Sequence, residues 1–160
     1  MDPAPRESNS CGRMIKLCIH PSPEAVASAL AQAILAAFDA PTTGRPRALM
    51  LAGGRTPKAA YEQVAASGRR LPDELSLIIG DERYVPADHA DSNARMMQPF
   101  LHAVQCPSDR LITPDTALPR DACAEDFGRR LDRFLANGVV TTCFLGLGAD
   151  GHTAGLFSAS

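Results

Sequence analysis

An acid and an imidazole stand two residues apart in the glycine-rich stretch LGLGADGHTAGLF, near the end of the sequence. Histidine titrates near pH ~6.5, so at neutral pH its imidazole is mostly a free base that can take a proton from water. Asp150 can orient the imidazole of His152 or stabilise its protonated form. The amides of Gly146, Gly148 and Gly151 can donate hydrogen bonds to an oxyanion. The pattern is typical of general base catalysis, and we predict that Asp150 and His152 are catalytic.

The segment LAGGRTPKAAY carries a second group of candidate residues, suited to an anion. Gly53 and Gly54 allow a tight turn and a close approach of a ligand to the backbone, although an ordinary capped helix after a turn would also use them. The following helix would direct its first amides and the positive end of its dipole at a negative charge. Arg55 and Thr56 add a guanidinium and a hydroxyl. We predict a phosphate-binding loop, which is neither a dinucleotide fingerprint nor a nucleoside triphosphate loop.

A third group follows the apolar run LSLII, in the segment GDERYVP. Arg83 can bind a phosphate or a carboxylate through two parallel hydrogen bonds. Asp81 and Glu82 can accept hydrogen bonds from sugar hydroxyls, although the three charges can also neutralise one another at a loop surface. In the segment HADSNARMM, Asn93 can face the same ligand, and Ser92 is best read as a helix cap.

Hydrophobic patterns predict the elements that position these three groups. Alternating or continuous apolar runs predict strands at 14–20, 47–52, 74–79 and 139–148. Apolar residues at helical spacing predict helices at 22–40, 56–67, 94–104, where Pro99 should kink or interrupt the helix, and 121–135. Strands that alternate with helices predict an α/β domain, with a parallel sheet covered by helices on both faces.

Each of the three candidate groups leaves the carboxyl end of a predicted strand. In a parallel sheet these ends lie along one edge, where open α/β folds bind their ligands. We therefore expect the glycine loop, the GDER segment and the Asp150–His152 pair to face one another across a single crevice.

The composition narrows the class of protein. The 160 residues fit one domain, 45% of them are hydrophobic, and a net charge of −2 without a basic run argues against nucleic acid or a membrane surface as a partner. The five cysteines show no metal-ligand spacing, and no metal or cofactor is predicted. An odd number of cysteines without a pairing framework is typical of a reducing cytoplasm, where thiols stay free. Residues 1–13 predict a disordered tail, so the domain is expected to span residues 14–160.

Together, the segments LAGGRTPKAAYEQVA, IIGDERYVPADHADSNARMM and LGLGADGHTAGLF resemble, in order and spacing, the motifs of the 6-phosphogluconolactonases. The resemblance implies a Rossmann-like three-layer α/β/α fold shared with the sugar-phosphate isomerases. It implies metal-independent hydrolysis of 6-phosphogluconolactone to 6-phosphogluconate, a step of the oxidative pentose phosphate pathway. It also implies that His152 activates water, that Asp150 assists it, and that residues 53–56 and Arg83 hold the substrate, particularly its phosphate.

The sequence departs from the resembled motifs at several points. Ala52 and Arg55 stand where the family often has serines. Family members continue beyond the point where this sequence stops, so the resemblance implies a domain that lacks its carboxyl-terminal part, with a helix from Thr153 cut short. We expect such a chain to be marginally stable and weakly active or inactive.

Two other functions remain open. Glucosamine-6-phosphate deaminases share the resembled fold, but their loops tend to read DGHIAFNEP and DEY, where this sequence has DGHTAGLF and GDERYVP. A sugar-phosphate-binding remnant or sensing domain would need the anion loop but not the Asp150–His152 pair. The motifs favour a cytoplasmic hydrolase that acts on a phosphorylated sugar lactone, and they leave the oligomeric state open.

Overall fold

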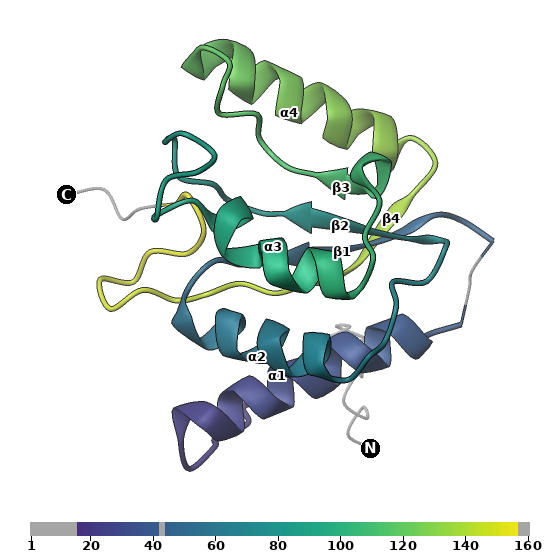
Figure 1. The fold of residues 1–160 in the computed structure, drawn as a ribbon, viewed down its shortest axis with the longest axis vertical. Coiled ribbons are helices and arrows are strands. Elements are labelled where there is room, and N and C mark those ends of the chain that lie inside the picture. The colour runs from purple at the N-terminus through teal and green to yellow at the C-terminus, as the bar shows by residue number, and fades with distance from the viewer. Residues whose placement is uncertain (1–15, 42–43, 157–160) are drawn as a thin grey trace, which may run out of the picture.

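The computed structural model of the chain describes residues 16–41 and 44–156. These residues form a four-stranded parallel sheet (Figure 1). The strand order is β3-β2-β1-β4, with β1 (Arg47–Leu51), β2 (Leu75–Ile79), β3 (Leu111–Ile112) and β4 (Val139–Cys143). The predicted α/β class with a parallel sheet is confirmed.

Helices cover both faces of the sheet, which gives the predicted three layers. They are α1 (Pro23–Asp39), α2 (Arg55–Ala66), α3 (Asn93–Ala103) and α4 (Arg120–Leu135), together with a short 3₁₀ helix at Ser108–Arg110. The first three pack on one face and α4 lies on the other (Figure 1). Within the described ranges, no helix combines the length and the apolar character needed to cross a membrane.

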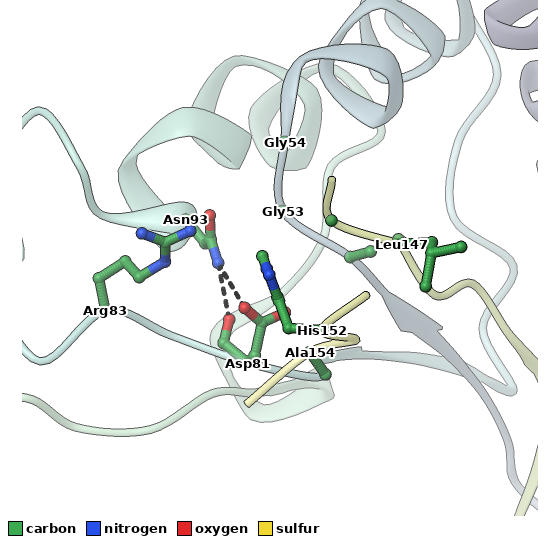
Figure 2. A pocket seen from close by; sticks show the side chains of 11 residues that line it. Gly53, Gly54, Asp81, Arg83, Asn93, Leu147, His152 and Ala154 are labelled. Atoms are coloured by element: carbon green, nitrogen blue, oxygen red, sulfur yellow. Dashed lines mark hydrogen bonds between the residues drawn. The ribbon is translucent and has the colours of Figure 1, made fainter. Parts of the chain in front are cut away.

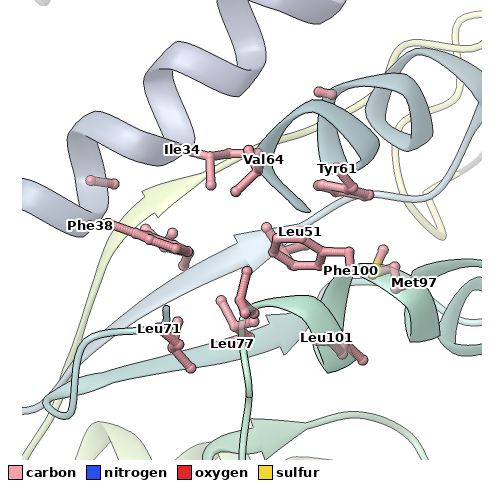
Figure 3. Packing of buried hydrophobic residues seen from close by; sticks show 14 of the residues in the cluster. Ile34, Phe38, Leu51, Tyr61, Val64, Leu71, Leu77, Met97, Phe100 and Leu101 are labelled. Atoms are coloured by element: carbon pink, nitrogen blue, oxygen red, sulfur yellow. The ribbon is translucent and has the colours of Figure 1, made fainter. Parts of the chain in front are cut away.

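The larger part of the core lies between the sheet and helices α1 to α3 (Figure 3). Leu49 and Leu51 of β1 face this side, where Phe38 and Val64 come from α1 and α2. The intervening Ala48 faces α4 instead. Because both faces of the inner strands are buried, their sequences are continuous apolar runs rather than alternating ones.

The prediction of a first strand at 14–20 is wrong for the residues of this segment that the structure describes. Lys16–His20 has no strand conformation, and Leu17 and Ile19 are 80% and 85% exposed. No described strand pairs with this segment, so an alternating sequence gains none of the cross-strand contacts that stabilise a strand. Residues 14 and 15, and the tail predicted at 1–13, lie outside the described residues.

The structure also differs from two expectations about helices. Pro99 does not interrupt α3, because its exposed ring is accommodated within a continuous helix that gives up one backbone hydrogen bond. No helix begins at Thr153. Instead, Thr153 and Leu156 exchange backbone hydrogen bonds of 3.1 and 2.9 Å, and Ala154 adopts a φ of 50°, which closes a tight turn.

Candidate active site

A cavity of ≈ 190 Å³ lies at the carboxyl ends of β1, β2 and β4 (Figure 2). All three predicted loops and the first turn of α3 line it. The lining residues are Ala52, Gly53, Gly54, Asp81, Arg83, Asn93, Gly146, Leu147, Gly148, His152 and Ala154. The loops therefore meet at one crevice, as their places after parallel strands predicted. The chemical roles of the residues stay predictions.

The imidazole of His152 is held by Asp150. The distance between His152 Nδ1 and Asp150 Oδ1 is 2.5 Å, and the His152 amide lies 3.3 Å from the same oxygen. The hydrogen bond from His152 keeps the pKa of the Asp150 carboxyl below its usual value, so this carboxylate is ionised at neutral pH. A carboxylate that accepts from Nδ1–H selects the tautomer in which Nε2 carries the lone pair, and Nε2 is therefore the nitrogen that can act as a base.

The backbone of Gly148 lies directly against this imidazole. A Cβ at position 148 would lie 2.2 Å from Cε1 of His152 and 2.7 Å from Oδ1 of Asp150. The amide of Gly148 donates to the His152 carbonyl at 2.8 Å, and the amide of Gly151 donates to the Gly148 carbonyl at 3.0 Å. These two amides are used within the loop, which corrects the expectation that they could serve an oxyanion.

Asn93 connects two of the three loops. Its Nδ2 donates to the Asp81 carbonyl at 2.9 Å and to the Asp81 carboxylate at 3.3 Å. On its other side, a Cβ added to Gly53 would lie 2.1 Å from Asn93 Oδ1. The side chain of Asn93 thus needs glycine at position 53, and it holds the GDER segment against the glycine loop.

The predicted phosphate loop is only partly in the cavity. Helix α2 begins at Arg55, with Gly54 as its N-cap at a φ of 113° and without a side-chain hydrogen bond to the first turn. Thr56 is therefore the second residue of this helix. Arg55 and Thr56 do not line the crevice but a separate depression of ≈ 410 Å³ beside the start of α1. Gly53 and Gly54 alone represent this loop in the crevice.

The GDER segment supplies charge to the crevice. In the described part of the chain, no carboxylate forms an ion pair with the guanidinium of Arg83, so its donors can bind an anionic ligand. Asp81 lines the same cavity, whereas Glu82 lines only an adjoining depression of ≈ 330 Å³ that also reaches His152. Across residues 16–41 and 44–156, no three His, Cys, Asp or Glu side chains are grouped as metal ligands would be.

Tyr61 supports the backbone of Ala52, which lines the crevice. It was not among the candidate site residues predicted from the sequence. It is buried, its hydroxyl donates to the Ala52 carbonyl at 2.8 Å, and its ring stacks on Phe100 at 5.1 Å. Burial raises its pKa, so the hydroxyl stays protonated and remains a donor. A tyrosine in an amphipathic helix has no sequence signal that separates this role from ordinary packing.

Comparison with known proteins places the chain in a family. A family model described as glucosamine-6-phosphate isomerases/6-phosphogluconolactonase matches residues 21–160. A 6-phosphogluconolactonase from Thermotoga maritima is 35% identical over 111 residues, which cover 68% of this chain and 49% of that protein. The chain spans about half the length of the curated relatives it matches.

Solved structures share the fold. A 6-phosphogluconolactonase from Trypanosoma cruzi superposes with a TM-score of 0.75 at 28% identity, covering 87% of this chain and 61% of that one. A monomeric glucosamine-6-phosphate deaminase superposes with a TM-score of 0.65 at 19% identity, covering 82% and 55%. The fold is thus common to two chemistries, and the choice between them depends on the site.

Proposed function

Because the chain belongs to the glucosamine-6-phosphate isomerase/6-phosphogluconolactonase family, we propose that it hydrolyses 6-phosphogluconolactone to 6-phosphogluconate. One observation carries the proposal. His152, held by Asp150, lies in the same cavity as Gly53, Gly54 and Arg83. A base and groups that suit an anion are thereby brought together around one cavity, which a small sugar phosphate can enter.

In the proposed reaction, Nε2 of His152 takes a proton from a water molecule as that water attacks the lactone carbonyl. The C–O bond to the ring oxygen then breaks, and the imidazolium returns the proton to this oxygen. Asp150 stabilises the positive charge on the imidazole between the two steps. A positioned base of this kind contributes roughly 10²–10⁴-fold to a rate.

The substrate is proposed to bind through the other two loops. Arg83 and the backbone at Gly53 and Gly54 hold the phosphate, where α2 starts without a side-chain cap and its dipole favours an anion. Asp81 accepts hydrogen bonds from sugar hydroxyls, and Asn93 holds it in place. The step corresponds to lactone opening in the oxidative pentose phosphate pathway.

The decisive experiment measures lactone opening above the spontaneous rate, for the chain and for His152→Ala. We expect the variant to lose 10²–10⁴-fold in rate. His102→Ala, which removes an exposed histidine from the last turn of α3, is the matched control and should leave the rate unchanged. Equal rates for the chain and His152→Ala would contradict the proposal.

The same samples distinguish the two alternatives. Release of ammonia from glucosamine 6-phosphate would assign the chain to the deaminases instead. Binding of 6-phosphogluconate without any turnover would identify a sugar-phosphate-binding remnant.

A further inference from the structure

The carboxylate of Glu82 accepts four hydrogen bonds, three of them from residues at the start of α3. Its Oε1 accepts from the amides of Arg83 at 2.7 Å and Asn93 at 2.6 Å. Its Oε2 accepts from the amide of Ala94 at 2.7 Å and from the hydroxyl of Ser92 at 3.1 Å. A carboxylate offers about four lone-pair positions, and all of them are used by the chain itself.

The hydroxyl of Ser92 is committed in the same way. It is the N-cap of α3 and accepts from the amide of Arg95 at 3.1 Å while it donates to Glu82. Ser92 is buried, with 2% of its surface exposed. The negative charge of Glu82 thus lies at the positive end of the α3 dipole, which leaves this helix start without capacity for a phosphate.

Two of the four partners of Glu82 line the crevice. Arg83 and Asn93 both donate backbone amides to the same oxygen, Oε1. The Asn93 side chain in turn reaches Asp81 and lies against Gly53 (Figure 2). One carboxylate is thereby connected to the backbone of Arg83 and, through Asn93, to Asp81 and the glycine loop.

We propose that Glu82 is a positioning residue, which does not touch the substrate but sets the places of Arg83 and Asn93 in the crevice. Its effect on turnover rests on the proposed function. Its effect on the two loops does not, and it can be measured on the chain without any ligand.

The first test uses Glu82→Gln and Glu82→Asp. Glutamine puts an NH₂ group opposite amides that are themselves donors, and aspartate keeps the charge but is one methylene too short. We expect kcat/KM to fall at least tenfold, mainly because KM rises. The decrease of kcat/KM at acidic pH should be retained. Ser22→Ala is the matched control, because it removes the N-cap of α1, a 3.2 Å hydrogen bond to the Ala25 amide away from the crevice, and it should lower stability without raising KM.

A double-mutant cycle separates positioning from direct contact. If Glu82 acts in part through Arg83, the loss in the double variant Glu82→Gln/Arg83→Ala should be smaller than the sum of the two single losses. Two results would overturn the proposal. If the losses in kcat/KM of the two single variants add fully, or if kcat/KM of Glu82→Gln no longer decreases at one end of the pH range, then Glu82 contacts the substrate or transfers a proton.

Amide hydrogen exchange provides the readout that needs no activity. In Glu82→Gln, or in Glu82→Asp if the first variant does not fold, the amides of Asn93 and Ala94 should exchange at least tenfold faster, and the Gly53 amide resonance should shift. Ser22→Ala should do neither. An unchanged Gly53 resonance would overturn the positioning role. A clear shift in a chain that never opens the lactone would reject the proposed function and support the positioning role.

Discussion

Nδ1 of His152 and Oδ1 of Asp150 lie 2.5 Å apart across a single residue, Gly151, whose φ is 84°. Few residues other than glycine adopt that conformation without strain. The loop is closed by its own backbone hydrogen bonds from Gly148 and Gly151. The acid–imidazole pair is therefore built from neighbouring residues, and the rest of the fold has only to bring it to the other loops.

We expect the Asp150 carboxyl to titrate below the usual aspartate pKa of about 3.9, because the His152 hydrogen bond favours the charged form. With a lowered folded-state pKa, the contribution of this pair to stability is complete above the unfolded value and is lost as the pH falls through the folded value. Carbon-13 NMR of the carboxyl group measures the midpoint. His152→Ala should return the midpoint to the usual value, and His102→Ala should leave it lowered. An unchanged midpoint in His152→Ala would assign the shift to another cause.

Gly148→Ala should disable the imidazole without removing it. The new Cβ would lie 2.2 Å from His152 Cε1, so the ring must leave its place beside Asp150. We expect kcat to fall at least tenfold with little change in KM. Gly128→Ala is the control, since its Cβ would meet no atom within 4 Å and helix propensity should add about 0.5–1 kcal/mol of stability. Normal turnover in Gly148→Ala would mean that the ring tolerates displacement.

Gly53→Ala should disturb the part of the crevice that Gly53 and Asn93 line. A Cβ 2.1 Å from Asn93 Oδ1 would expel a side chain that is 7% exposed and break its hydrogen bonds to Asp81. Overpacking of this kind costs about 1–3 kcal/mol, and KM should rise. Urea unfolding of the double variant with Asn93→Ala provides the check, since removing Asn93 relieves the clash. Its loss should be smaller than the sum of the single losses, and strict additivity would argue against the contact.

Pro99→Ala should stabilise the chain by about 2 kcal/mol. Proline within a helix costs roughly 3 kcal/mol, of which about 1 is returned through the lower entropy of the unfolded state. The residue is exposed in α3, so alanine removes no buried contact. The midpoint of urea unfolding should increase while lactone opening stays the same. A lower midpoint would show that the proline ring makes a contribution that its exposure does not reveal.

The roles of some residues could be predicted from the sequence, and those of others could not. Ser92 was recognisable as a helix cap, and its hydroxyl accepts from the amide of Arg95 in the first turn. Arg55 and Thr56 belonged to the predicted anion loop, but helix α2 already begins at Arg55, and both residues line another depression. Glu82 looked like a ligand-binding carboxylate, and its oxygens accept from residues ten to twelve positions further along the chain.

Strands β1, β2 and β4, the four α-helices, the parallel sheet and the meeting of three loops at one edge followed from the sequence by itself. Those features depend on apolar periodicity and turn residues, which act between neighbours in the chain. Only the tertiary structure decided which side chains enter the crevice, that Gly148 and Gly53 must lack a Cβ, and that residues 16–20 form no strand. These outcomes depend on contacts between segments far apart in the chain, and a local pattern does not specify such partners.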